Sequence, residues 1–166
     1  YLGDGTGSIG DPLLFSGTDN INFLVPGDFN GDGKDDLFIV DASSTGRILL
    51  SKGGGQFTVV NDFAITNLRY LTPVAADFNG DGILDLATAL NDVAGVAVLP
   101  GLGSGGVGNG TFGPPTQYPL AQLSTGIETG DFNGDGVPDL VATENSAGSI
   151  GILLGTGNPT LGPGSF

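Results

Sequence analysis

The chain has 166 residues, enough for one domain with a hydrophobic core, and a formal net charge of −14. Only four residues are Lys or Arg, which excludes a nucleic-acid interface or an anionic membrane surface, because both need clustered basic residues. There is no Cys and no His, which excludes disulfides, cysteine-ligated zinc and a histidine general base.

Short apolar runs bounded by glycine follow one another along the chain and predict β-strands. No window shows the apolar spacing of an amphipathic helix, and Gly and Pro recur too often for one. No apolar run approaches the roughly 20 residues that cross a bilayer, so we expect no membrane insertion. The runs that predict strands lie within 21–27, 38–40, 46–57, 68–76, 87–90, 95–105, 125–130, 141–143 and 149–157.

A ten-residue string occurs three times among these runs. It reads DFNGDGKDDL at 28–37, DFNGDGILDL at 77–86 and DFNGDGVPDL at 131–140. The spacing of about 50 residues is typical of one β-propeller blade. We therefore predict an all-β fold of about three propeller-type blades, each of four antiparallel strands. The approximate repeats are 1–49, 50–98 and 99–152, and 153–166 starts a further repeat. The alternative is an ordinary β-sandwich, which three near-identical decamers disfavour.

Three blades are too few to close a ring, because propellers usually have four to eight. An open propeller exposes strand edges that can pair with another chain. We expect the ring to be completed by further repeats of a longer chain or by other copies of the chain, one supplying a strand to another's blade. Tyr1 is not an initiator Met, so we also expect a chain processed from a longer precursor.

Each string places oxygen donors at its positions 1, 3, 5 and 9, a pattern that suits Ca²⁺, which accepts six to eight oxygen ligands. Glycines at positions 4 and 6 allow the loop to turn sharply. A backbone carbonyl at position 7 would complete the shell, and the side chain there varies among the copies. The three predicted Ca²⁺ sites are Asp28, Asn30, Asp32, Lys34 and Asp36; Asp77, Asn79, Asp81, Ile83 and Asp85; and Asp131, Asn133, Asp135, Val137 and Asp139.

Other interpretations of the string fit its residues less well. An EF-hand or a dockerin-like loop needs a Glu at position 12 and flanking helices, whereas position 12 is Ile39, Thr88 or Ala142. A plain solvated turn explains one copy better than three with equal spacing. Position 8 varies, so Asp35 is interpreted as a bystander. Position 2 is always Phe, and we expect these rings to pack between blades: Phe29, Phe78 and Phe132.

The string, the apolar strand after it, the segments ILLGTG and VAVLPG, and GTFGPP at 110–115 resemble FG-GAP/VCBS repeats. These are the calcium-bearing blades also found in the β-propeller of integrin α-subunits. The resemblance covers nearly the whole chain and implies four-stranded blades with Ca²⁺ held between the first two strands by the twelve side chains named above. The departure is the blade count, since family propellers have about seven.

These features predict a non-catalytic calcium-binding module, extracellular or at the cell surface, that acts in adhesion or structural assembly. The alternative is a lectin-like propeller, in which the glycine-rich segment 101–110 presents sugar sites beside Tyr1, Tyr70 or Tyr118. An enzyme is not expected, because the chain has no Ser/His/Asp set and its paired carboxylates lie in the loops. Protein or glycan ligands are left open as partners.

Overall fold

The computed structural model describes residues 5, 11, 13, 14, 20–42, 45–64, 73–90, 93–145, 148–157 and 166. All the regular structure in these residues is antiparallel β-sheet, which confirms the predicted all-β class. The described residues contain no helix long and apolar enough to cross a membrane.

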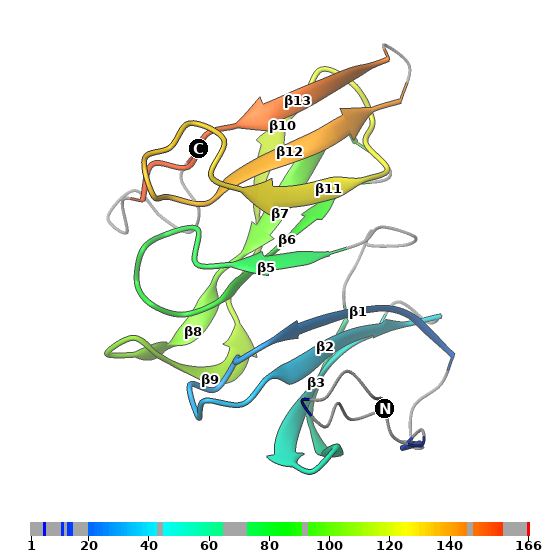
Figure 1. Ribbon diagram of the computed structural model, residues 1–166. Helices are drawn as coiled ribbons and strands as arrows, with labels where there is room; N and C mark the ends of the chain where they lie inside the picture. The colour runs from blue at the N-terminus through cyan, green and yellow to red at the C-terminus, as the bar shows by residue number, and fades with distance from the viewer. Residues whose placement is uncertain are drawn as a thin grey trace.

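Three sheets follow one another in chain order, with a separate hairpin inserted in the second (Figure 1). The first sheet has the order β1-β2-β3-β4 and consists of β1 (Ile21–Gly27), β2 (Asp36–Asp41), β3 (Thr45–Gly53) and β4 (Gln56–Ala64). The second has the order β5-β6-β7-β10 and consists of β5 (Val74–Ala76), β6 (Asp85–Ala89), β7 (Gly95–Leu99) and β10 (Thr116–Pro119). The third consists of β11 (Ile127–Gly130), β12 (Asp139–Glu144) and β13 (Ser149–Leu153), and the inserted hairpin of β8 (Gly101–Ser104) and β9 (Val107–Phe112).

The sheets are the predicted blades. Two of them have the four expected strands, and the third has three within the described residues. The first strands of the three sheets lie side by side, since β5 contacts both β1 and β11. The three sheets that the structure describes do not close into a ring (Figure 1). The predicted repeat boundaries stay a prediction; they cut β3, β7 and β13, the third strand of each sheet.

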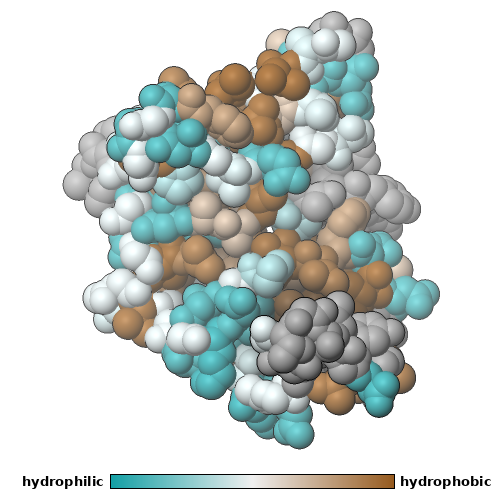
Figure 2. Space-filling view, in the orientation of Figure 1, coloured by the Kyte–Doolittle hydropathy of each residue, from teal (hydrophilic) through white to brown (hydrophobic). Residues whose placement is uncertain are grey.

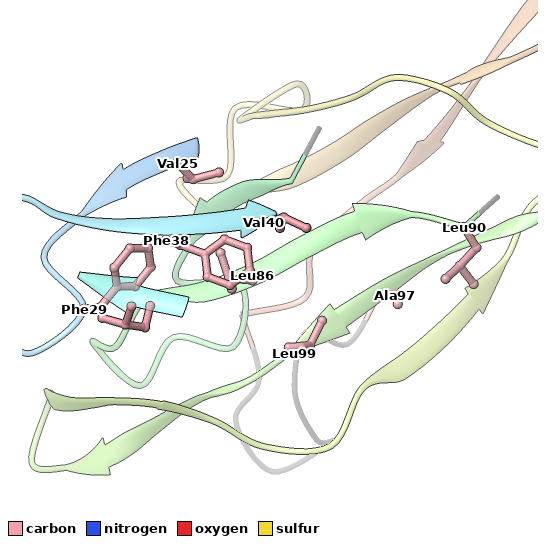
Figure 3. Close-up of a cluster of buried hydrophobic side chains, with 9 residues drawn as sticks. Val25, Phe29, Phe38, Val40, Leu86, Leu90, Ala97 and Leu99 are labelled. Carbon is pink, nitrogen blue, oxygen red and sulfur yellow. The ribbon is translucent and has the colours of Figure 1, made fainter. Parts of the chain in front are cut away.

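Within the described residues, two clusters of buried hydrophobic side chains lie between neighbouring sheets, one between each pair. In the first cluster, Phe29 and Phe38 of the first sheet pack against Leu86 and Leu99 of the second (Figure 3). In the second cluster, residues of the second sheet pack against Leu140 and its neighbours in the third. The middle sheet is therefore buried on both faces, and every residue of β6 and β7 is buried.

The alternation of side chains along each strand gives every sheet two distinct faces. We call the face that points toward the next sheet in the chain the forward face, and the opposite one the rear face. In the second sheet, Ala87 lies on the forward face and packs against the third sheet, whereas Leu86 lies on the rear face and packs against the first. The forward face of the first sheet includes Phe38 and Ile48.

Candidate metal centre

Each repeated string forms the loop between the first and second strands of its sheet, as the sequence predicted. The loops connect β1 to β2, β5 to β6 and β11 to β12. Both glycines of each loop have positive φ angles, for example 71° at Gly31 and 81° at Gly33, which explains why positions 4 and 6 are glycine. The three strings therefore form one loop conformation three times.

Hydrogen bonds within each loop gather the oxygens of positions 1, 3 and 5. In the second loop, Asp77 Oδ1 and Asn79 Oδ1 both accept from the backbone N–H of Asp81, at 3.1 and 2.9 Å. Asp77 Oδ2 accepts from Gly82 N–H at 2.8 Å, and Asp81 Oδ1 accepts from Ile83 N–H at 2.8 Å. The first and third loops contain the same four bonds.

The loops differ in what else their carboxylates contact. In the first loop, Lys34 Nζ lies 2.9 Å from Asp32 Oδ2, and this contact lowers the pKa of Asp32. In the third, the Asn133 side-chain amide donates to Asp135 Oδ2 at 2.9 Å, and the N–H of Gly136 lowers the pKa of Asp131. The second loop carries Ile83 at the position of Lys34, so its acidic residues face no cation within the loop.

The aspartate at position 9 is fully buried in all three loops and accepts two backbone hydrogen bonds. Oδ2 accepts from the N–H of the position-2 Phe, at 3.2 Å in Phe29, 3.1 Å in Phe78 and 2.8 Å in Phe132. Oδ1 accepts from an N–H in or just beyond the third strand, at 2.8 Å in Ser51, 2.7 Å in Gly101 and 2.8 Å in Gly155. Burial raises the pKa of Asp36, and it raises the pKa of Asp85 to about 7.

The chain matches the family described as the FG-GAP-like repeat over residues 28–88 and 102–142, more than half its length. It belongs to this family. The first match contains two of the repeated strings and the second contains the third. A comparison with curated proteins found no match.

The donor chemistry of each FG-GAP loop fits a hard cation. In the described part of the chain, no three acidic side chains form a group that could hold a metal ion. A metal ion in these loops would be held by the carboxylates at positions 1 and 5, the amide oxygen at position 3 and the carbonyl at position 7. Such a mixed oxygen set suits Ca²⁺. Position 9 was predicted as a ligand as well, and its two hydrogen bonds give it a structural role whether or not it binds metal.

The inserted hairpin β8–β9 lies against the first two loops, a contact that the sequence did not predict. Gly110 N–H donates to Phe29 O at 3.1 Å, and a Cβ at Gly31 would lie 2.8 Å from Val107 Cγ1. The sequence predicted a strand within 95–105 and a glycine-rich segment at 101–110, but no hairpin. The signal that could have revealed the hairpin is the Gly105-Gly106 pair between two short extended runs.

Proposed function

We propose that this FG-GAP repeat chain is a non-catalytic calcium-binding module that acts outside the cell, or at its surface, in adhesion or structural assembly. One observation supports it above all: the same hydrogen bonds order all three loops. In each loop, side-chain oxygens of positions 1 and 3 accept from the backbone N–H of position 5, and the side-chain oxygen of position 5 accepts from the N–H of position 7. Ca²⁺ is the partner of the three loops in this proposal.

Electrostatics gives calcium a role in stability. Ten of the 18 acidic residues lie in the three strings, where they repel one another. A cation bound by the folded loop alone stabilises the fold by RT ln(1 + [L]/Kd), about 2.7 kcal/mol per site at a hundredfold excess over Kd. Extracellular calcium modules have dissociation constants of about 10⁻⁴ to 10⁻³ M, which matches a role outside the cell.

Thermal melting tests the proposal. We expect excess Ca²⁺ to raise the melting temperature above that in chelator, and equal Mg²⁺ to raise it less. The matched variant replaces the first ligand of each loop (Asp28→Asn, Asp77→Asn and Asp131→Asn) and should lose the calcium response. An unchanged melting temperature of the natural chain in excess Ca²⁺ would refute calcium binding.

The carbohydrate-binding alternative gains no support from the tyrosines. Tyr118 packs edge-on against Phe166, with ring centroids 5.1 Å apart, and burial raises its pKa. Its ring is therefore already engaged in the core layer between the second and third sheets. Tyr1 and Tyr70 lie outside the described residues.

A further inference from the structure

Two segments of the chain cross the repeated loops, each just after the third strand of a sheet. After β7 the segment is the hairpin β8–β9, and after β13 it is the stretch 154–157; we call them the crossing segments. In Figure 1 the hairpin lies between the loop after β1 and the loop after β5. Figure 2 shows pale and hydrophilic residues over most of this side of the molecule, with hydrophobic residues in small patches.

The hairpin contacts position 7 of the second loop and position 4 of the first. A Cβ at Gly103 would lie 2.9 Å from Ile83 Cδ1, and the Ile83 side chain beside the hairpin is only 7% exposed. At the first loop, a Cβ at Gly31 would lie 2.8 Å from Val107 Cγ1. One element of structure therefore packs on two neighbouring loops.

The stretch after β13 makes the same pair of contacts one sheet further along the chain. A Cβ at Gly155 would lie 2.8 Å from Val137 Cγ1, at position 7 of the third loop. A Cβ at Gly80, at position 4 of the second loop, would lie 3.1 Å from Gly157 O. The buried aspartates at position 9 accept from the backbone of the same two segments, at Gly101 and at Gly155. The second loop is therefore contacted by both crossing segments.

The contacted positions are those that a bound cation would hold most firmly. Position 7 supplies the carbonyl ligand of the calcium site proposed above, and position 4 lies between the ligands at positions 3 and 5. The carboxylates of an empty loop repel one another, whereas a cation draws the ligands together and restrains the backbone between them. A loop that holds calcium therefore presents a firmer surface to the segment that crosses it.

The hairpin needs such surfaces, because ordering it is costly. Six of the 12 residues in 101–112 are glycine, which loses more conformational freedom on folding than any other residue. Within the described residues β8 and β9 pair only with each other, and an isolated two-stranded hairpin is marginally stable in water. Phe112 anchors one end by edge-on contacts with Phe29 and Phe38. The other end rests on the second loop, where a Cβ at Gly82 would lie 3.1 Å from Gly106 Cα.

We propose that the crossing segments couple neighbouring calcium loops, so that calcium in one loop strengthens calcium binding in the next. The hairpin couples the first loop to the second, and the stretch after β13 couples the second to the third. The first ion orders the shared segment, so the second ion binds a loop whose neighbour is already in place, which gives positive cooperativity. Charge alone has the opposite effect, because one bound cation repels the next. This coupling rests on the calcium-binding function proposed above.

Titration calorimetry on chains with two active loops measures the coupling. Asp131→Asn leaves the first and second loops active, Asp28→Asn the second and third, and Asp77→Asn the first and third. For each neighbouring pair, the product of the two affinities should exceed that of the matching single-loop chains at least about fivefold, the low end of allosteric couplings. The first and third loops share no crossing segment, so this pair is the matched control and should bind two ions independently.

Val107→Ala tests the hairpin directly, because it removes the side chain that packs on Gly31. It should weaken the coupling of the first and second loops but not that of the second and third, and Val107→Ile should preserve both. Leu102→Ala is the control on the same hairpin, since Leu102 is 42% exposed and contacts Gly113, and it should change neither coupling. Hydrogen exchange of the amides in 103–109 should slow when calcium fills either of the first two loops alone.

The titrations separate the coupling from calcium binding itself. Calcium binding without cooperativity in the two neighbouring pairs overturns the coupling and keeps the calcium-binding function. Equal cooperativity in the pair of the first and third loops also overturns it, and so does a coupling that Val107→Ala leaves unchanged. If none of the single-loop or two-loop chains binds calcium, both the function and the coupling are wrong.

Discussion

Replacing Asp85 by alanine should destabilise the protein even when no calcium is present. Asp85 is fully buried in the middle sheet and joins the second loop to Gly101, the first residue of β8. Its Oδ2 accepts from Phe78 N–H at 3.1 Å and its Oδ1 from Gly101 N–H at 2.7 Å. Asp85→Ala removes both acceptors at once and leaves two backbone donors in a region that water does not reach.

The magnitude follows from the two stranded donors. A buried donor without a partner costs about 1–3 kcal/mol, so two cost about 2–6 kcal/mol. Burial offsets part of this, because it raises the pKa of Asp85 to about 7 and so makes the ionised carboxylate costly to hold. We therefore expect a loss of about 3 kcal/mol, a large share of the 5–15 kcal/mol that stabilises a typical domain.

Urea denaturation in excess chelator measures this loss without any contribution from metal binding. The control is Asp35→Ala, which removes one negative charge from an exposed position of the first loop and should change stability by less than about 0.5 kcal/mol. A loss below about 1 kcal/mol for Asp85→Ala in chelator, with a large loss only in Ca²⁺, would show that the carboxylate acts as a metal ligand alone.

Three further predictions concern charge and backbone in the loops. In chelator, the stability that Asp85 contributes through its raised pKa should be fully present below its unfolded pKa of 3.8 and be lost as the pH rises through about 7. The reason is that the folded state retains a proton that the unfolded chain has released. Urea denaturation from pH 4 to 8 should show this fall, and the Asp85→Asn variant should not show it. Lys34→Ala should strengthen calcium binding to the first loop a few-fold, because the Lys34 ammonium contacts Asp32. Titration calorimetry measures this in a chain whose other two loops carry Asp77→Asn and Asp131→Asn. Equal or weaker binding contradicts a ligand role for Asp32. Gly31→Ala and Gly134→Ala both place a side chain at a positive φ angle, which costs roughly 1–2 kcal/mol of stability. Only the Cβ at position 31 contacts Val107, so Gly31→Ala should lower the free energy of unfolding in urea by about 1 kcal/mol more than Gly134→Ala. Equal losses would mean that the hairpin does not pack tightly against the first loop.

The sequence predicted the fold class and the loop positions because both depend on local chemistry. Glycines end several of the strands, as Gly27 ends β1 and Gly53 ends β3, and the Asp-Asn-Asp alternation caps backbone N–H groups within its own loop. The expectation that the position-2 aromatics pack between blades is confirmed for Phe29 and Phe78. Phe132 is exposed instead, because no sheet in the described structure follows the third.

Other features depend on contacts between distant residues and could not be predicted. The string identifies Asp85 as an oxygen donor, but only the register of β6 and β7 brings Gly101 N–H to it across 16 residues. The segment 101–112 has too much glycine to show the apolar alternation of a strand pair. Its place on the first loop depends on a backbone contact between Gly110 and Phe29.

The repeated string therefore serves two separable purposes. Its positions 2 and 9 join the loop to the sheet through the buried aspartate, and its positions 1, 3 and 5 order the loop itself. The third loop shows that this order is local: Asp131 and Asp135 are exposed and no atom lies near a Cβ at Gly134 or Gly136, yet its hydrogen bonds match those of the covered loops. Oxygens held together without help from packing need little rearrangement to bind a cation, and such preorganisation favours binding. A repeat that kept Phe and Asp at positions 2 and 9 but lost the first three donors should fold without responding to calcium.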